Sequence, residues 1–132
     1  MEKKLAIHLK DAVTGPMQGG RGTFRIFIDE ETCGARQLSL LMNTLQGGTQ
    51  TAGHQHEEES CFYILSGRGT ISIGDQSFDV GPQTAVFVPA RVRHKIDACP
   101  GEDLTYIMIY APPGPEQQLK IRGGYGSLPE KS

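Results

Sequence analysis

The sequence predicts an all-β fold in which short strands joined by tight turns close into a sandwich or barrel. The 132 residues include 17 glycines and 8 prolines, and these are spread at turn-like intervals instead of being clustered. Between them lie short apolar or alternating segments of strand length, whereas helix signals are nearly absent. The length fits one domain that can bury a core without disulfides.

Most of the expected strands follow one another in the middle of the chain. The segments with the composition of strands are 23–28, 37–45, 61–65, 70–73, 76–80, 84–88 and 104–110, and 91–96 leads into another. Residues 37–45 also have the composition of a short helix, but strand is favoured because the segment is short and Gly47-Gly48 follows it. Residues 29–34 are expected to form a turn.

The single domain is divided into three parts. Residues 1–37 are predicted to form an N-terminal arm and the first strands, residues 38–111 the barrel core, and residues 112–132 a polar C-terminal tail. The tail is expected to be loose or laid over the surface.

Composition excludes several function classes. The net charge is -2 and no basic patch stands out, so no nucleic-acid partner is expected. There is no apolar run long enough to cross a membrane and no signal-peptide pattern, so no membrane association is expected. The three cysteines, Cys33, Cys61 and Cys99, form no C-x-x-C pair. They are expected to be free thiols in a cytoplasmic protein.

The sequence His54-Gln55-His56 carries the chemistry. On an extended chain, alternate side chains point to the same face, so these two imidazoles lie side by side and can share one metal ion. Imidazole suits Zn, Cu, Fe and Ni, and the pair alone does not choose among them. An H-x-H pair is also common on the solvated face of a strand. His8 is interpreted as an ordinary surface histidine.

Two glycines frame this pair. Five residues lie between Gly48 and His54, and Gly67 closes the apolar strand that follows. The frame resembles the first motif of the cupin family, G-x5-H-x-H-x3,4-E-x6-G. The cupin fold is a small jelly-roll barrel, also called a double-stranded β-helix.

A second resemblance to the same family lies further along the chain. Gly81, then seven residues, Pro89 and His94 fit the second cupin motif, G-x5,7-P-x-G-x2-H-x3-N. The resemblance covers roughly residues 38–110, with both motifs in the right order and at the right spacing. It implies that His94 joins His54 and His56 as a metal ligand, which spacing alone does not show.

The chain departs from the family motifs at three positions. Ser60 stands where the first motif has its glutamate, and Arg91 and Ala98 replace the glycine and asparagine of the second. The first departure is chemical, because metal-binding cupins typically use three histidines and that glutamate. Water is the simplest replacement for the missing carboxylate. Glu58 or Glu59 could reach the ion if the chain bulges, although an acidic, solvated turn is the favoured interpretation of both.

A site of three neutral histidines leaves the full charge of a divalent ion uncancelled. The ion is then a stronger Lewis acid, and its open positions can take water, dioxygen or a substrate oxygen.

The resemblance implies one divalent transition metal, Fe, Zn, Ni or Mn, and a small-molecule substrate. Cupins without the glutamate include dioxygenases, the favoured class here, and also cyclases, lyases and isomerases. A non-catalytic cupin that binds a small ligand is a further alternative. The resemblance also implies a homodimer.

Strand phase suggests which side chains line the site. Phe62 and Ile64 share the phase of His54, His56 and Ser60, so they are expected to point inward, whereas Cys61 should face away. On 104–110, either Leu104, Tyr106, Met108 and Tyr110 or the alternate set faces inward, and the sequence does not decide between them. If the first set does, Tyr106 or Tyr110 could act as acid, base or orienting group. Further candidates for substrate contact are Gln50, Ser60, Phe62 and Arg91, although an isolated loop arginine is more often simply exposed.

Overall fold

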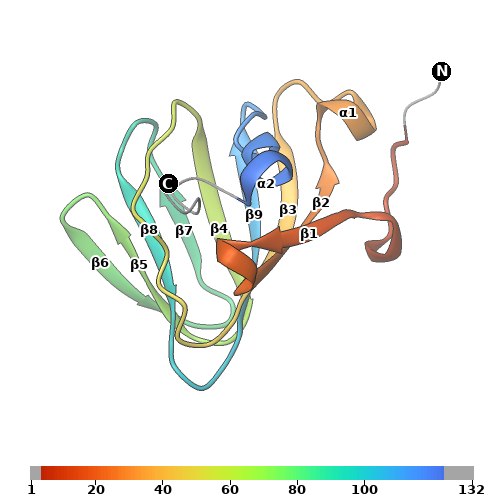
Figure 1. The fold of residues 1–132 in the computed structure, drawn as a ribbon. Helices are drawn as coiled ribbons and strands as arrows, with labels where there is room; N and C mark the ends of the chain where they lie inside the picture. The colour runs from red at the N-terminus through yellow and green to blue at the C-terminus, as the bar shows by residue number, and fades with distance from the viewer. Residues whose placement is uncertain (1–3, 124–132) are drawn as a thin grey trace.

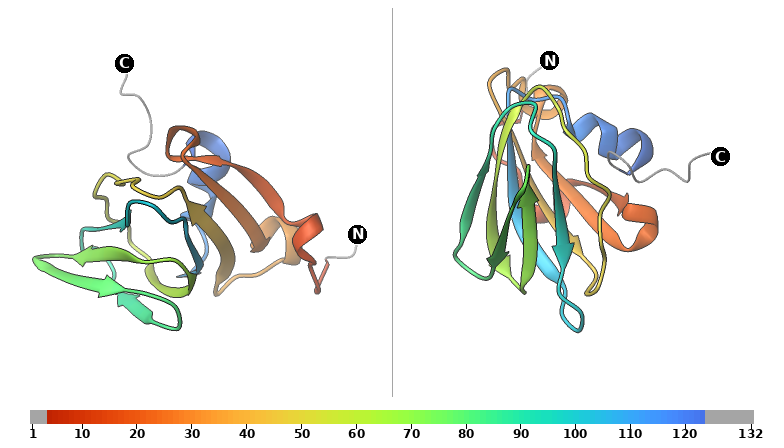
Figure 2. Two further views of the ribbon diagram at one scale, coloured as in Figure 1. Left: turned by 90° about the horizontal axis from the view of Figure 1, so that it is seen from below. Right: turned by 90° about the vertical axis from the view of Figure 1, so that its left-hand side faces the viewer.

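The protein is built from two β-sheets that face each other, as the computed structural model in Figures 1 and 2 shows. The structure describes residues 4–123. The large sheet has the strand order β1-β2-β3-β9-β4-β7 and the small sheet the order β6-β5-β8. The strands are β1 (Val13–Met17), β2 (Gly22–Ile28), β3 (Ser39–Leu45), β4 (Glu59–Ser66), β5 (Gly69–Ile73), β6 (Gln76–Val80), β7 (Ala85–Val88), β8 (His94–Ala98) and β9 (Leu104–Ala111). All pairs between these strands are antiparallel. The predicted all-β jelly roll is therefore confirmed.

The alternation of side chains fixes which face of each strand is buried. In β3 and β9, every second residue is buried and the others are half-buried or exposed. The inward set of β9 is Leu104, Tyr106, Met108 and Tyr110, which settles the choice that the sequence left open. Phe62 and Ile64 of β4 also point inward and Cys61 does not. Leu41, Ile64 and Leu104 are completely buried between the sheets and lie at the centre of the core.

A long segment between β3 and β4 completes the small sheet without forming a regular strand. Residues 46–58 run alongside β8, and two isolated antiparallel bridges join them to it, Gln50 to Asp97 and His54 to His94. The Thr51 hydroxyl strengthens this pairing because it donates to the Ile96 carbonyl at 2.8 Å and accepts from the Ile96 N–H at 3.1 Å. This segment carries the first two histidines, and its pairing with β8 brings them to the third.

Helical structure is limited to short pieces in the described residues. They are the 3-10 turns η1 (Leu9–Asp11) and η2 (Gln18–Gly20) and the helices α1 (Glu30–Cys33) and α2 (Glu116–Arg122). The predicted turn at 29–34 contains α1, which Asp29 caps by accepting a hydrogen bond from the Thr32 N–H at 2.8 Å. No helix in the part of the chain that the structure describes is long and apolar enough to span a membrane.

Part of the predicted C-terminal tail forms a helix, which the sequence did not predict. Helix α2 is docked on the barrel by a buried polar network. Glu116 accepts from the Ser39 hydroxyl at 2.7 Å, and the Lys120 ammonium lies 2.8 Å from the Asp29 carboxylate. The sequence missed this helix because it is short and lies between prolines and glycines. The last nine residues of the predicted tail, 124–132, lie outside the described residues.

Candidate metal centre

His54 and His94 are placed side by side by the backbone. The His54 N–H donates to the His94 carbonyl at 3.0 Å, and the His94 N–H donates back at 2.8 Å. Residues paired directly in this way project their side chains on the same side of the sheet. The ring centroids of the two imidazoles are 4.5 Å apart.

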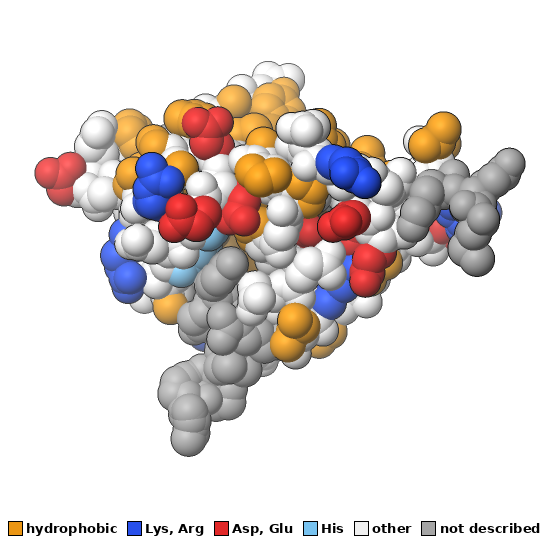
Figure 3. Space-filling model, turned by 90° about the horizontal axis from the view of Figure 1, so that it is seen from above, with side chains coloured by type: hydrophobic (Ala, Val, Ile, Leu, Met, Phe, Trp, Pro, Cys, Tyr) orange, Lys and Arg blue, Asp and Glu red, His pale blue; other side chains and the backbone are white. Residues whose placement is uncertain are grey.

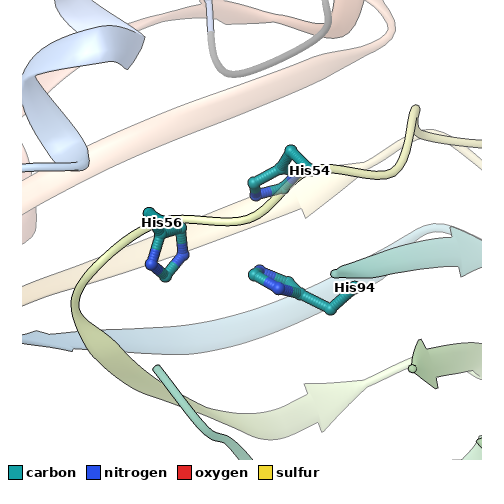
Figure 4. A group of neighbouring side chains, drawn as sticks. All are labelled: His54, His56 and His94. Atoms are coloured by element: carbon teal, nitrogen blue, oxygen red, sulfur yellow. The ribbon is translucent and has the colours of Figure 1, made fainter. Parts of the chain in front are cut away.

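His56 reaches the same place from two residues further along the chain. Its ring centroid lies 4.9 Å from that of His94 and 5.7 Å from that of His54. The three residues form a group whose candidate ligand nitrogens all lie within 4.8 Å of one another. Figure 4 shows the three rings projecting into a common space, two from the segment before β4 and one from the start of β8.

Backbone carbonyls orient the rings. Nδ1 of His56 lies 2.9 Å from the Glu58 carbonyl, and Nδ1 of His94 lies 2.9 Å from the Val92 carbonyl. A carbonyl can only accept, so these Nδ1 atoms carry the proton and leave Nε2 with the lone pair that a metal needs. The Nε2 atom of His94 is buried and has no partner among the described residues. These donor atoms fit a divalent transition metal held by imidazole ligands.

Electrostatics keep the three rings neutral. Burial, the neighbouring His94 and the nearby Arg93 lower the pKa of His54 to about 4, against a partial offset from the Ala52 carbonyl. Burial also lowers the pKa of His56 and of His94, although the Glu58 and Val92 carbonyls, respectively, oppose it. Neutral imidazole is the form that binds a metal, so the site is ready for a cation near neutral pH.

The structure does not bring the two candidate glutamates into the cluster. Glu58 lies behind His56, where its carboxylate is 3.7 Å from Nδ1 and therefore on the side of the ring away from Nε2. Glu59 is exposed at the start of β4. Ser60 is buried and points inward, and its Oγ has no partner among the described residues. Among residues 4–123, the histidine cluster therefore contains no carboxylate.

An apolar cavity adjoins the histidines inside the barrel. Its lining residues include His54, His94, Phe62, Met108 and Tyr110. The lining also includes Met17 and Gln18 from the end of β1 and η2, and Pro115 and Leu119 from the α2 region. Seen from above, Figure 3 shows some histidine side-chain surface beside acidic and basic side chains.

The candidate pocket residues are distributed unevenly. Phe62 and Tyr106 line the cavity together with His54 and His94. Ser60 points into the barrel beside Tyr110, its partner in the strand register. Arg91 is exposed and pairs with Glu57 at 3.2 Å. Gln50 is exposed and borders a groove on the small sheet, and it is not among the lining residues of the cavity.

Asn43 is a polar residue of the cavity lining that sequence reasoning missed. Asn43 of β3 is 2% exposed and lies directly opposite Tyr106 of β9 in the strand register. A hydrogen bond joins the two side chains, but burial dominates and raises the pKa of Tyr106 to about 12. The signal that could have found Asn43 is its phase, because it alternates with Leu41 and Leu45 on the buried face of β3.

Comparison with known proteins agrees with this site. The sequence model of the cupin domain matches residues 41–110, a little over half of the chain. The chain belongs to the cupin family. The barrel core and both histidine segments of this cupin lie within the matched region.

Two uncharacterized proteins are related to this cupin in sequence. Protein SCO3923 of Streptomyces coelicolor is 31% identical over 78 residues, which cover 59% of this chain and 73% of that protein. Protein MJ1618 of Methanocaldococcus jannaschii is 28% identical over 75 residues, covering 56% of this chain and 60% of that protein. The match therefore spans less than two thirds of the second relative.

Solved structures share the fold. The polyketide cyclase RemF from Streptomyces resistomycificus is 25% identical, with a TM-score of 0.69 over 84% of this chain and 80% of its own. KdgF from a Halomonas species is 15% identical, with a TM-score of 0.75 over 87% of this chain and 99% of its own. A Bacillus subtilis oxalate decarboxylase is 21% identical, with a TM-score of 0.71 over 85% of this chain but 30% of its own. The last two show only the common fold.

Proposed function

We propose that this cupin is a metal-dependent enzyme that acts on a small organic molecule. His54, His56 and His94 would hold one divalent transition metal, with iron, zinc, nickel and manganese as candidates. The observation that carries the proposal is the convergence of three neutral imidazoles beside an apolar cavity. Barrel packing does not require three buried or half-buried imidazoles, whereas a metal site does.

The residues of the site have distinct roles in this proposal. A bound divalent cation would supply Lewis-acid polarisation of a substrate oxygen. Because the cluster contains no carboxylate, no ligand charge would cancel that of the cation. The backbone carbonyls behind His56 and His94 hold these rings in the tautomer that exposes Nε2. Phe62 and Met108 supply apolar walls that exclude water from the substrate.

Tyr106 would act as a hydrogen-bond donor rather than as a base. Its pKa of about 12 keeps the hydroxyl protonated near neutral pH. A protonated phenol can donate to a substrate oxygen and stabilise negative charge on it. Removal of a substrate proton would then fall to another group, such as a water molecule.

Two reaction classes follow from the site. Non-oxidative chemistry of the cyclase type comes first, because RemF, a polyketide cyclase, is similar to this chain over most of both lengths. Dioxygenase chemistry is the second candidate, favoured by three neutral ligands and open positions on one face. The homodimer and the cytoplasmic location remain predictions from the sequence.

Metal substitution tests the proposal and separates the two classes. The protein is prepared with zinc or with ferrous iron and assayed with polyketide-like phenols, diketones and thiols, by product analysis and oxygen uptake. Turnover by both forms without oxygen uptake supports the cyclase class, and uptake by the iron form alone supports the dioxygenase. The proposed site is contradicted if the protein binds neither metal. It is also contradicted if the variant His54→Ala binds both metals as tightly as the wild type does.

A further inference from the structure

Asn43 is an unusual residue for its position. Its neighbours along the inward face of β3 are Leu41 and Leu45, both completely buried. Its cross-strand partner is Tyr106, and Tyr106 in turn faces Ile64 of β4. A polar amide in such a row costs free energy unless both its ends are hydrogen-bonded.

Only one end of this amide is satisfied within the protein. The Asn43 Oδ1 atom is buried and has no partner among the described residues. The hydrogen bond to Tyr106 is therefore made by the Asn43 amide nitrogen. An N–H donor occupies a lone pair of the Tyr106 oxygen and leaves its hydroxyl proton available. The pair thus offers one acceptor and one donor at neighbouring positions.

The location of the pair connects it with the metal centre. Asn43 and Tyr106 come from the large sheet, whereas His54 and His94 come from the small sheet and the segment beside it, and all four line one cavity. Phe62 also lines this cavity, with its ring centroid 5.3 Å from that of Tyr106. A ligand in the cavity would therefore meet polar groups from both sheets and the aromatic ring of Phe62.

We infer that Asn43, with Tyr106, is a specificity-determining residue that recognises a hydroxyl group of the substrate. A hydroxyl both donates and accepts, so it satisfies the Asn43 Oδ1 atom and the Tyr106 O–H together. The substrate class is then a compact, apolar, flat molecule with two polar groups, an oxygen directed to the histidines and a hydroxyl directed to Asn43. The oxygen directed to the histidines rests on the proposed function, whereas the hydroxyl directed to Asn43 rests on Asn43 alone.

The chain offers a direct probe of this site. Asn43 is the only asparagine in the sequence, so protein labelled with ¹⁵N-asparagine shows a single side-chain amide group by NMR. The probes are benzoate and its 2-, 3- and 4-hydroxy derivatives, titrated into zinc-loaded and metal-free protein. At least one hydroxybenzoate should move the Asn43 amide signals, and benzoate should move them little.

Variants test the same recognition by affinity. The double variant Asn43→Leu/Tyr106→Phe removes every polar atom of the pair, so it should fold at least as stably as the wild type. Zinc-loaded wild type should bind the best hydroxybenzoate about tenfold more tightly than benzoate, the worth of one good hydrogen bond. The double variant should lose that preference and keep its zinc. Thr49→Val is the control, because Thr49 also has a buried oxygen without a partner among the described residues but is not a lining residue of the cavity.

The outcomes separate this inference from the proposed function. Equal affinity across the series, absence of binding, a preference that survives in the double variant, or unmoved Asn43 signals would each overturn the inference. A protein that takes up no zinc overturns the proposed function instead. In that case the NMR titration of metal-free protein tests the role of Asn43 independently. The Asn43 amide signals either move when a hydroxybenzoate is added or do not.

Discussion

His54 and His94 are hydrogen-bonded backbone partners, although forty residues separate them in the sequence. This pairing, and not a flexible loop, brings their rings to 4.5 Å between centroids. The candidate metal centre is therefore part of the sheet hydrogen-bond network. Ligand geometry should be largely formed before a cation binds, so that binding should need little rearrangement of the backbone.

Removing one ligand should abolish tight metal binding without unfolding the barrel. We expect His94→Ala to weaken zinc binding by at least about 100-fold, because two imidazoles rarely hold a divalent ion in competition with water. Isothermal titration of zinc measures the loss. His8→Ala is the matched control, since His8 is an exposed histidine that caps η1. Equal affinity of the two variants would show that zinc binds elsewhere.

Ser60→Glu should restore the carboxylate that the cupin motif has at this position. It should also make the metal-free protein less stable. Ser60 is 4% exposed, and an unpaired carboxylate there would be buried. The metal-free variant should melt at a lower temperature than the wild type, and zinc should raise its melting temperature by more than it raises that of the wild type. Ser60→Gln has nearly the same size without the charge. If Ser60→Gln gains as much from zinc, the carboxylate does not reach the cation.

The sequence predicted the parts of this protein that follow local rules. Both histidine segments, the strand at 37–45 and the inward direction of Phe62 follow from period-two alternation and turn residues. The inward set of β9 could not be predicted in this way, because Ile107 and Ile109 are as apolar as Met108. Only tertiary packing distinguishes the inward set from the outward set. Asn43 was also missed, since nothing local shows that a single amide in an apolar strand faces a cavity.

Helix α2 could not be predicted from the sequence for a different reason. Its seven residues are too few to be stable alone, so contacts from distant parts of the chain must hold it. In these contacts the Ser39 hydroxyl donates to Glu116, and the Lys120 ammonium donates to the Asp29 carboxylate. Ser39 and Asp29 lie more than 70 residues before their partners in the sequence. Pairing at such separation could not be predicted from one sequence.

Gly67→Ala should be severely destabilising. Gly67 has φ of 85°, and a Cβ atom there would lie 2.0 Å from the Asp103 carbonyl oxygen. Backbone strain and this collision with backbone should together cost more than about 3 kcal/mol, measured by urea unfolding. Gly101→Ala is the control, because Gly101 has φ of 92° with open space around it. That change should cost only about 1–2 kcal/mol. Similar losses in both variants would mean that φ alone explains the effect.

Asp29→Asn should make the stability of the protein less dependent on acid pH. Burial alone would raise the pKa of Asp29, but hydrogen bonds from Lys120, Thr32 and Gln117 together lower it below 3.8. A lowered pKa means that the carboxylate stabilises the fold fully above about pH 4. That contribution is lost as the pH falls through the lower folded-state value.

We therefore expect Asp29→Asn to lower the free energy of unfolding by about 2–3 kcal/mol at pH 7, the typical worth of hydrogen bonds to a buried charged group. The difference from the wild type should shrink as the pH falls below 4, because the wild-type carboxylate then becomes protonated as well. Urea unfolding at pH 7, 4 and 2.5 measures it. Asp75→Asn, at an exposed carboxylate in the turn between β5 and β6, should unfold within about 0.5 kcal/mol of the wild type at pH 7. A gap for Asp29→Asn that stays constant down to pH 2.5 would show that the amide perturbs packing and that the charge of Asp29 does not stabilise α2 on the barrel.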